Sequence, residues 1–347
     1  MYYLIQMSKI VEAIVDKYSL NPQIKFHIIQ YINEYLHYYN TNDLNTFYSN
    51  NARKIDWNSL SFKTNFIFNE IMCNLMNKLV GKYTFTNDSC IDFNMENDNI
   101  LQKLNNDGYC IGHIDKSMCD SILDSMKNIS FKERSTGRIV SYNSTINYQD
   151  NCAWAKSQEE VINIPAVQNL ICDHKLLNIV QNYLNAKPIL TQTNLWFTKN
   201  INNNNKVDNA QLFHRDFDHE RWIKIFIYIK DVNIVNGPHV FVKKSHTNVG
   251  TVGRGAFVRE SDETIKKNYP CDDIVTHTGK SGTIIFEDTR GYHKGLPVVE
   301  GERVLLQLEF AINPSYGNTH IKKVNNPIKL LKEAKQKYPY VFQNIRI

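Results

Sequence analysis

Two histidines and one carboxylate in this chain are spaced as metal ligands. His214 and Asp216 are separated by one residue in segment 211–216, and His293 closes segment 288–293 far downstream. Two imidazoles and a carboxylate in this order are what a facial-triad iron(II) site needs, and they leave the other coordination positions open. Residues 211–303 are therefore the stretch around which we expect the chain to be organised.

Arg303 follows His293 by ten positions and begins an apolar run. A guanidinium inside a barrel must meet an anion, because an unpaired buried charge is costly. The distal carboxylate of 2-oxoglutarate would meet it through bidentate contacts. A 2-oxo acid would also take two of the open metal positions and leave one for dioxygen.

Strands must position these side chains, and the second half of the chain is rich in them. If residues 212–216 form a strand, His214 and Asp216 share one face, because side chains alternate along a strand. The strand-like runs bounded by Gly, Pro or Asn are 189–198, 212–216, 223–229, 239–242, 274–277, 283–287 and 303–312. Runs of this kind with turn signals between them predict a double-sheet barrel or jelly roll.

The first half of the chain has helical periodicity. Apolar residues recur at i and i+4 within 10–15, 24–36 and 66–79, and Pro22 suits the first turn of the second run. Further helices are expected near 101–106, at 116–129 and at 164–184. Helices followed by strands make the chain α+β.

Residues 86–99 are polar and acidic, which is typical of a linker. We therefore predict a helical N-terminal region at 1–99 and a catalytic domain at 100–347. The N-terminal helices would cap the barrel or mediate a homodimer.

Composition excludes several classes of protein. The 40 basic and 35 acidic residues are interspersed and give a formal charge of +5, so a basic patch for nucleic acid is not expected. No stretch approaches the roughly 18 apolar residues of a membrane span. The seven cysteines are odd in number and scattered, so we expect neither a disulfide framework nor a structural zinc site. A cytoplasmic protein with reduced thiols is the expectation.

Several motifs together carry a family resemblance over about residues 101–315. They are His214-Arg215-Asp216, segment 230–242 with Asn236-Gly237-Pro238, Lys244-Ser245-His246, segment 282–295, and an opening Asp107-Gly108-Tyr109. With these motifs the chain resembles the phytanoyl-CoA dioxygenase family of non-haem iron(II), 2-oxoglutarate-dependent oxygenases. The resemblance implies a double-stranded β-helix core of the jelly-roll or cupin-like kind with flanking helices. Residues 1–99 fall outside it.

The resemblance also implies cofactors and the residues that hold them. Iron(II) would be bound by His214, Asp216 and His293. Arg303 would anchor 2-oxoglutarate, and dioxygen would be the second cosubstrate. An amide on the strand at 191–196 would contact 2-oxoglutarate, with Gln192 as the first candidate and Asn194 as the second.

Two positions depart from the commoner family pattern. Leu305 stands where a Ser or Thr is usual, and Gly295 stands where some relatives carry a hydroxyl. Tyr228 or Thr193 is a candidate for the missing donor. The carboxylate of Asp216 favours hydroxylation or desaturation over halogenation, because halogenating relatives have a small residue there.

Substrate-facing residues are expected on loops. Residues 134–154 have weak periodicity and many hydrogen-bonding side chains, so they form either a pocket-lining loop or a surface loop. The candidates from this loop and from segments beside the metal ligands are Tyr142, Trp154, Trp222 and Arg290. His219, His239 and His246 are not expected to be ligands, and polar segment 200–208 is expected to form a loop near the site.

The implied function is hydroxylation of an unactivated C–H bond in a small-molecule, glycan-type or carrier-linked metabolite, with release of succinate and carbon dioxide. One alternative is a catalytically silent member that binds a ligand or partner, which has no need to bury so many charged groups. The other is a zinc hydrolase with the same ligands, which does not explain Arg303. Fold and cofactor leave the substrate open.

Overall fold

The computed structural model describes residues 2–41, 57–86, 88–89, 93–95, 99–142, 148–200, 211–250, 252–253, 258–313 and 322–347. The expected loop at 200–208 lies outside these ranges except for its first residue. The helices are α1 (Tyr2–Val15), α2 (Pro22–Asn40), α4 (Trp57–Lys63), α5 (Ile67–Val80), α6 (Ile100–Asp107), α7 (Lys116–Met126), α8 (Gln158–Ile162), α9 (Pro165–Cys172), α10 (His174–Leu184), α11 (Asp262–Asn268), the 3-10 helix η2 (Cys271–Asp273) and α12 (Lys329–Lys337).

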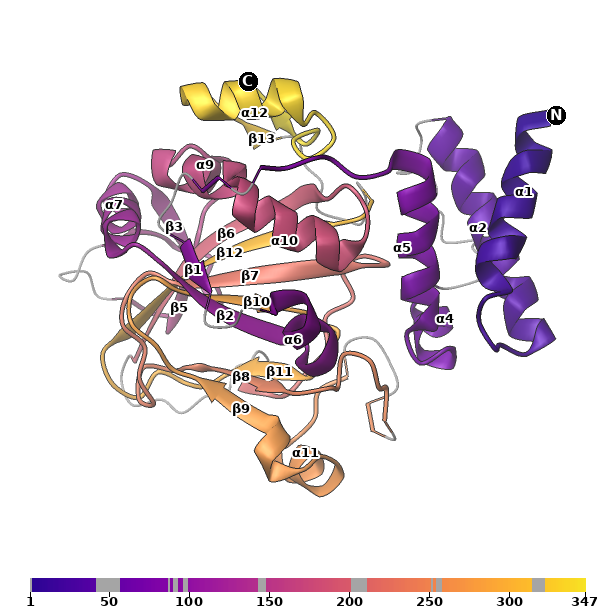
Figure 1. The fold of residues 1–347 in the computed structure, drawn as a ribbon. Helices are drawn as coiled ribbons and strands as arrows, with labels where there is room; N and C mark the ends of the chain where they lie inside the picture. The colour runs from indigo at the N-terminus through magenta and orange to yellow at the C-terminus, as the bar shows by residue number, and fades with distance from the viewer. Residues whose placement is uncertain are drawn as a thin grey trace.

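Two antiparallel sheets form the body of the chain, with a smaller sheet below a larger one in Figure 1. The order in the large sheet is β1 (Phe93–Met95), β2 (Tyr109–Ile114), β10 (Thr283–Glu287), β7 (Trp222–Tyr228), β12 (Glu302–Ala311), β6 (Ile189–Lys199), β5 (Cys152–Ala155), β3 (Ser130–Glu133) and β4 (Ile139–Ser141). The order in the small sheet is β11 (His293–Gly295), β8 (His239–Val242) and β9 (Ile274–His277). A short parallel pair joins β13 (Lys322–Lys323) to β14 (Ile345–Arg346). The chain therefore mixes helices with antiparallel sheets, as predicted.

Most expected strands are present, and one is much shorter than expected. Strands β8, β9 and β10 have the predicted bounds, and β6, β7 and β12 differ from them by one residue at an end or at both ends. Segment 212–216 forms only two isolated bridges, in which Phe213 pairs with Glu260 and His214 pairs with His293. Strand β4 and all of β5 except its last residue lie within residues 134–154, which the sequence predicted to be a loop.

The helix predicted at 164–184 is two helices that meet at Asp173. Its backbone is extended there, with φ −65° and ψ 122°, which ends α9. Its carboxylate accepts a hydrogen bond from Leu176 N at 2.9 Å and caps α10. Aspartate is a favoured N-cap residue, so this local bond starts a second helix inside one apolar pattern.

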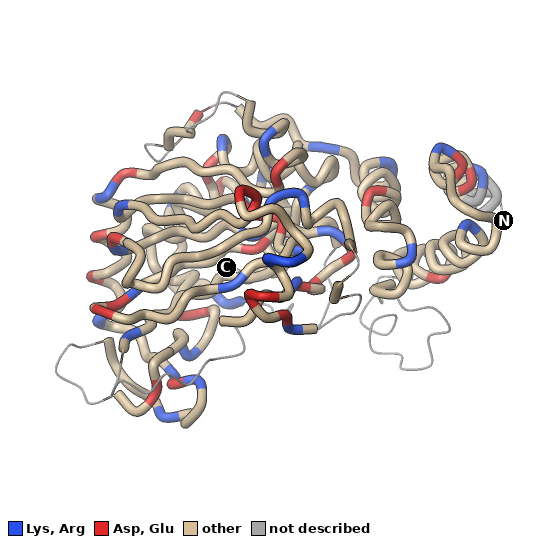
Figure 2. The backbone as a smooth tube through the Cα atoms, turned by 90° about the horizontal axis from the view of Figure 1, so that it is seen from below, with Lys and Arg blue, Asp and Glu red and all other residues tan. Residues whose placement is uncertain are grey.

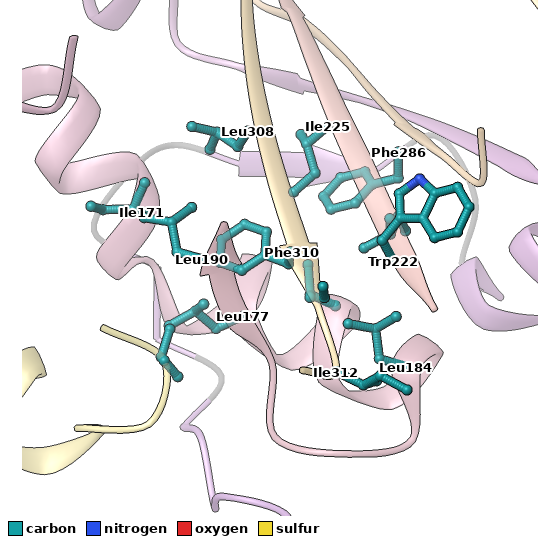
Figure 3. Close-up of a cluster of buried hydrophobic side chains, with 14 of the residues drawn as sticks. Ile171, Leu177, Leu184, Leu190, Trp222, Ile225, Phe286, Leu308, Phe310 and Ile312 are labelled. Carbon is teal, nitrogen blue, oxygen red and sulfur yellow. The ribbon is translucent and has the colours of Figure 1, made fainter. Parts of the chain in front are cut away.

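The main hydrophobic core lies between the large sheet and helices α9 and α10. Figure 3 shows side chains from both layers gathered in it: Ile171, Leu177, Leu184, Leu190, Trp222, Ile225, Phe286, Leu308, Phe310 and Ile312. Since side chains alternate along β12, this packing turns Arg303, Leu305 and Gln307 to the opposite face of the sheet.

The N-terminal helices pack beside the end of the sheets (Figure 1). Tyr31 of α2 donates a hydrogen bond to Glu220 Oε1 at 2.5 Å, and Phe62 of α4 contacts Phe217 with ring centroids 4.9 Å apart. The contacted residues, Phe217 and Glu220, follow Asp216 closely in the sequence. Residues 93–95 form β1 at the edge of the large sheet, so the chain joins the sheet before the predicted boundary at residue 99.

Charged residues of both signs are interspersed along the described backbone (Figure 2). Among the helices in the described ranges, none combines the length and apolar character that crossing a membrane requires.

Candidate metal centre and pocket

Two side chains that are close in the sequence and a third far downstream converge at one point. His214, Asp216 and His293 each offer one ligand atom, and these atoms lie within 4.8 Å of one another. Asp216 Oδ1 is 3.9 Å from His214 Nε2, and Asp216 Oδ2 is 3.4 Å from His293 Nε2. Within the part of the chain that the structure describes, this is the one cluster of His, Cys, Asp and Glu with such geometry. The structure therefore brings together the three residues that the sequence singled out.

Backbone pairing explains why the two histidines meet. His214 N donates to His293 O at 3.0 Å, and His293 N donates to His214 O at 2.9 Å. Residues that pair directly across antiparallel strands place their side chains side by side. The two imidazole centroids are accordingly 4.3 Å apart. Asp216 is held beside them by its backbone N, which donates to Thr289 O at 2.8 Å.

Each imidazole is oriented by a backbone carbonyl two residues earlier in the chain. His214 Nδ1 lies 2.9 Å from Leu212 O, and His293 Nδ1 lies 3.0 Å from Gly291 O. A carbonyl only accepts hydrogen bonds, so both Nδ1 atoms carry a proton, and both Nε2 atoms are turned toward Asp216. Ligating histidines are oriented in this way by their other ring nitrogen. The donor set therefore fits a divalent metal ion.

Burial and neighbouring charges shift the pKa values of the cluster in different directions. Burial alone would lower the pKa of His293, but Asp216 and Glu287 raise it above its ordinary value. Burial, with smaller contributions from His293 and Arg259, lowers the pKa of His214 to about 3, so this imidazole is neutral at physiological pH. Burial alone would raise the pKa of Asp216, but Lys224 and His293 hold that pKa well below its ordinary value. A neutral imidazole and an ionised carboxylate are the forms that bind a metal.

Lys224 of β7 was not identified from the sequence, and it contacts the carboxylate of the cluster. Its Nζ is 2.7 Å from Asp216 Oδ2, 2.7 Å from Asp218 Oδ2 and 3.6 Å from Glu309 Oε2. These carboxylates raise the pKa of Lys224 well above its ordinary value, although burial alone would lower it. A charged residue within the apolar run of β7 was a signal in the sequence that could have revealed it.

Arg303 lies at the start of β12 and is only 8% exposed. Its Nη1 donates to Gly237 O, and its Nε has no hydrogen-bond partner. Burial lowers the pKa of Arg303, and the side chains that act against this are Tyr228 and Cys152. Among the described residues, none of the carboxylates forms an ion pair with it. A buried cation in this state fits the distal carboxylate of 2-oxoglutarate.

Gly295 explains how Arg303 comes close to the clustered histidines. It lies two residues after His293 on β11, and a Cβ at position 295 would be 3.2 Å from Arg303 Nη1. A larger side chain would therefore crowd the guanidinium. The glycine that departs from some family patterns leaves room for Arg303.

The three clustered residues and Arg303 line one pocket with a volume of about 250 Å³. Its apolar wall comes mainly from the large sheet and consists of Trp154, Trp196, Phe226, Leu305 and Leu296. Trp154 and Trp196 are stacked, with ring centroids 4.3 Å apart and an interplanar angle of 17°. Trp154 is the one predicted substrate-facing residue that lines this pocket.

The predicted cosubstrate amides lie outside the pocket lining. Gln192 and Asn194 share a face of β6 with Trp196, but Asn194 Nδ2 donates to Gln192 Oε1 at 2.9 Å, and neither residue lines the pocket. Gln307, which pairs with Asn194 across β12 and β6, lines it instead. The Tyr228 hydroxyl donates to His277 O at 2.7 Å and accepts from His239 N at 3.0 Å, so backbone groups occupy it.

Three predicted substrate residues lie away from the pocket. The Tyr142 hydroxyl donates to Glu302 Oε1 at 2.7 Å. Trp222 belongs to the main core (Figure 3), and its Nε1 donates to Thr289 Oγ1 at 2.8 Å. Arg290 is 1% exposed and pairs with Asp288 at 2.6 Å. These side chains are absent from the lining because they are packed in the core or paired with carboxylates.

Comparison with known proteins gives the family. The model of the family described as phytanoyl-CoA dioxygenase (PhyH) matches residues 104–300, which is more than half of the chain. The chain belongs to the phytanoyl-CoA dioxygenase family. The match contains the clustered histidines and Asp216, and it ends three residues before Arg303. No curated protein matches the chain.

Solved structures resemble this phytanoyl-CoA dioxygenase family member distantly. The epimerase SnoN, in complex with Fe3+, alpha ketoglutarate and nogalamycin RO, is 12% identical with a TM-score of 0.45, covering 67% of this chain and 93% of SnoN. HygX from Streptomyces hygroscopicus, with nickel, 2-oxoglutarate and hygromycin B bound, is 12% identical with a TM-score of 0.43, covering 68% of this chain and 94% of HygX. EvdO2 from Micromonospora carbonacea var. aurantiaca, complexed with 2-oxoglutarate, is 12% identical with a TM-score of 0.44, covering 73% of this chain and 99% of EvdO2. At this similarity, their ligands do not assign ligands to this chain.

Proposed function

We propose that this protein is a non-haem iron(II), 2-oxoglutarate-dependent dioxygenase that hydroxylates a C–H bond of a small molecule or of a carrier-linked or glycan-type metabolite. Its core would be the double-stranded β-helix of the family. His214, Asp216 and His293 would hold the metal, and Arg303 would hold the distal carboxylate of 2-oxoglutarate. When bound, iron(II) with 2-oxoglutarate and dioxygen supplies the oxidation of a C–H bond, with release of succinate and carbon dioxide.

The observation that carries the proposal is the state of Arg303. A buried guanidinium whose electrostatic neighbours are Tyr228 and Cys152 lines the same pocket as the clustered histidines and Asp216. A buried cation without an anion is costly, and a bidentate carboxylate would remove that cost. A zinc hydrolase does not need such a partner for its reaction, and a silent binding protein would be separated from an oxygenase by the absence of succinate formation.

The other residues of the site prepare it for binding. The carbonyls of Leu212 and Gly291 fix both imidazoles with Nε2 toward Asp216. Lys224 keeps the Asp216 carboxylate ionised and restrains it through one oxygen. Trp196 and Phe226 form an apolar wall beside these groups, which limits the entry of water and strengthens the electrostatic contacts inside.

The test is anaerobic titration of the purified protein with iron(II) and then with 2-oxoglutarate. We expect a visible charge-transfer absorption band when the 2-oxo acid chelates the metal, and succinate formation once oxygen is admitted. His214→Ala should lose more metal affinity than the roughly 10- to 100-fold that removal of an outer-shell partner costs. Stoichiometric zinc with oxygen-independent hydrolysis, or no binding of either ligand, would reject the proposal.

The product of a turnover test distinguishes hydroxylation from other oxidations by the same cofactor. Incorporation of one labelled oxygen atom from dioxygen into the substrate indicates hydroxylation. A product without that atom indicates desaturation, epimerisation or cyclisation, for which Asp216 would serve equally as a ligand. Mass spectrometry with labelled dioxygen makes the measurement.

We also propose that the N-terminal helices cap the oxygenase domain at 100–347. The contacts of Tyr31 with Glu220 and of Phe62 with Phe217 support this arrangement. A homodimer through these helices and a cytoplasmic location stay predictions. Sedimentation analysis of the full chain tests the dimer.

A further inference from the structure

Two of the described side chains that line the pocket carry a buried polar atom without a hydrogen-bond partner. These atoms are Thr198 Oγ1 and Arg303 Nε. Thr198 is 7% exposed, so its hydroxyl is enclosed about as closely as the guanidinium. A buried hydroxyl without a partner costs free energy, and native structures retain few such groups. A ligand in the pocket that accepts hydrogen bonds would remove this cost at both atoms.

The large sheet places Thr198 beside Arg303. The two residues pair directly across β6 and β12. Directly paired residues in an antiparallel sheet point to the same face, with Cβ atoms roughly 4.5–5.5 Å apart. On its other side Thr198 pairs with Cys152 of β5, so Arg303 is the charged residue among these neighbours. The hydroxyl and the guanidinium therefore border the same part of the pocket.

The two side chains do not satisfy each other. Thr198 Oγ1 has no hydrogen-bond partner, so it accepts no proton from Arg303. A guanidinium can only donate hydrogen bonds, whereas a hydroxyl can also donate one. A single acceptor group placed beside both side chains could therefore take a proton from each. A carboxylate is such a group, because its two oxygens accept several hydrogen bonds and its charge matches the guanidinium.

Thr198 is the one residue with a hydroxyl group among the described residues of the pocket lining. The two hydroxyls that the sequence suggested as cosubstrate donors make other hydrogen bonds. The Tyr228 hydroxyl bonds to two backbone groups. Thr193 Oγ1 donates to Gln158 O at 3.3 Å, and Thr193 lies on the opposite face of β6 from Thr198, because side chains alternate along a strand. Thr198 is therefore the hydroxyl that is available beside Arg303.

We propose that the Thr198 hydroxyl is a second protein donor to the distal carboxylate of 2-oxoglutarate, beside the guanidinium of Arg303. This inference rests on the proposed function, which assigns that carboxylate to Arg303. The guanidinium supplies the positive charge, and the hydroxyl holds the carboxylate from the neighbouring strand. Two donors from paired strands fix the far end of the cosubstrate and make the site selective for a 2-oxo acid that carries a second carboxylate.

The test measures calorimetric binding of two matched 2-oxo acids to the full chain loaded with iron(II), without oxygen. They are 2-oxoglutarate and 2-oxopentanoate, which has the same chain length but a methyl group in place of the distal carboxylate. Thr198→Val removes the hydroxyl and keeps a branched side chain. We expect this change to weaken 2-oxoglutarate binding about 10- to 100-fold, the size of one hydrogen bond to a charged group. Binding of 2-oxopentanoate should not change, because this acid lacks the group that Thr198 contacts.

Control variants separate the hydroxyl from changes in shape or stability. Thr198→Ser keeps a hydroxyl and should retain most of the affinity for 2-oxoglutarate. Thr276→Val is the matched control and should leave that affinity unchanged, because Thr276 is an exposed threonine on β9 outside the pocket lining. In urea denaturation of the ligand-free chain, Thr198→Val should keep or raise the midpoint, because it removes an unsatisfied buried hydroxyl. Thr191→Val should lower the midpoint, because the Thr191 hydroxyl donates to Glu309 Oε1 at 2.6 Å.

The outcomes separate this inference from the function on which it rests. If the unsubstituted chain does not bind 2-oxoglutarate, the proposed function fails and this inference fails with it. If Arg303→Gln weakens 2-oxoglutarate binding but Thr198→Val does not, or if Thr198→Val weakens the binding of both 2-oxo acids equally, this inference alone is wrong. A loss of 2-oxoglutarate affinity that Thr198→Val causes and Thr198→Ser largely avoids supports it.

Discussion

Buried arginines in two regions of this protein have opposite surroundings. Arg303 lines the pocket, and its nearest electrostatic partners are Tyr228 and Cys152. Arg221 and Arg290 lie together outside the pocket, and both pair with Asp288. Each guanidinium has one buried nitrogen without a hydrogen-bond partner. The main difference is the charge that surrounds each group, because carboxylates lie against Arg221 and Arg290.

The paired arginines form a closed cluster. Asp288 Oδ2 accepts from Arg221 Nη1 at 2.7 Å, from Arg290 Nη2 at 2.6 Å and from the Tyr183 hydroxyl at 2.6 Å. Glu70 of α5 adds a second carboxylate, 3.5 Å from Arg221 and 3.9 Å from Arg290. A cation with carboxylates built around it contributes to the fold, whereas one without them is prepared for a ligand.

The largest effect on stability is expected for Asp288→Asn. This change leaves two buried guanidiniums without their shared carboxylate, which costs about 3–5 kcal/mol of unfolding free energy. Urea denaturation makes the measurement. Asp124→Asn is the control, because Asp124 forms an exposed pair with Lys127 and should change stability by less than about 0.5 kcal/mol. A cost below about 1 kcal/mol for Asp288→Asn would contradict the assigned structural role.

Arg303→Gln should weaken ligand binding without destabilising the fold, in contrast with Asp288→Asn. Loss of the charged partner should weaken 2-oxoglutarate binding by about 2–5 kcal/mol, or roughly 30-fold to several thousandfold. The unfolding free energy of the ligand-free protein should stay the same or rise, because a buried unpaired charge has been removed. Calorimetric titration and urea denaturation give the two values. A large loss of stability with unchanged 2-oxoglutarate affinity would place Arg303 with the paired arginines.

Lys322 is a third kind of buried cation, and its contribution to the unfolding free energy depends on pH. Its Nζ donates to Thr191 O at 2.9 Å, and burial lowers its pKa from 10.5 to about 8. Below pH 8 it is charged in both the folded and the unfolded chain, so the cost of burial is fully present. Between pH 8 and 10.5 the unfolded chain holds more of this proton, so this group makes the unfolding free energy rise with pH.

Lys322→Met should remove that rise and stabilise the protein near pH 7. The expected gain is about 1–2 kcal/mol, because the lost hydrogen bond offsets part of the removed cost. Unfolding free energies of both proteins from pH 7 to 10 provide the measurement. Parallel curves with no gain at pH 7 would show that burial does not penalise the Lys322 charge.

Glu70→Gln should have the smallest effect on the unfolding free energy. Its side chain is 49% exposed and lies at the longer distances from Arg221 and Arg290. Partly exposed ion pairs contribute roughly 0.2–1 kcal/mol and weaken with salt. We expect a loss of that size at low salt and less at high salt, in contrast with Asp288→Asn. A loss as large as that of Asp288→Asn would mean that Glu70 is an essential part of the cluster.

The cluster of His214, Asp216 and His293 was predictable because the signals for it are local in the sequence. Ligand type, the spacing of His214 and Asp216, and the strand-like runs around them stand in the sequence. The prediction of a strand at 212–216 was wrong, yet the three side chains still meet, because the isolated bridge between His214 and His293 brings them together. The burial of Arg303 was predictable because this residue begins an apolar, strand-like run.

The predicted amide contacts show where local information ends. Gln192 shares the correct face of β6, but Thr198 is the residue that pairs with Arg303. Gln192 is six positions before Thr198, which is about 20 Å along a strand. Alternation gives the face and not the position along it. The register between β6 and β12 was needed to identify Gln307 as an amide side chain that lines the pocket.

The sequence by itself determined which residue types could bind a metal, their order along the chain and the helical or strand-like character of most segments, because these depend on neighbouring residues. The tertiary structure decided which buried charges have partners. Arg290 lies three positions before His293 in the sequence but pairs with Asp288. Arg303 has no ion pair with any carboxylate among the described residues. Charge pairing depends on contacts between residues far apart in the chain, so it is set by register and packing.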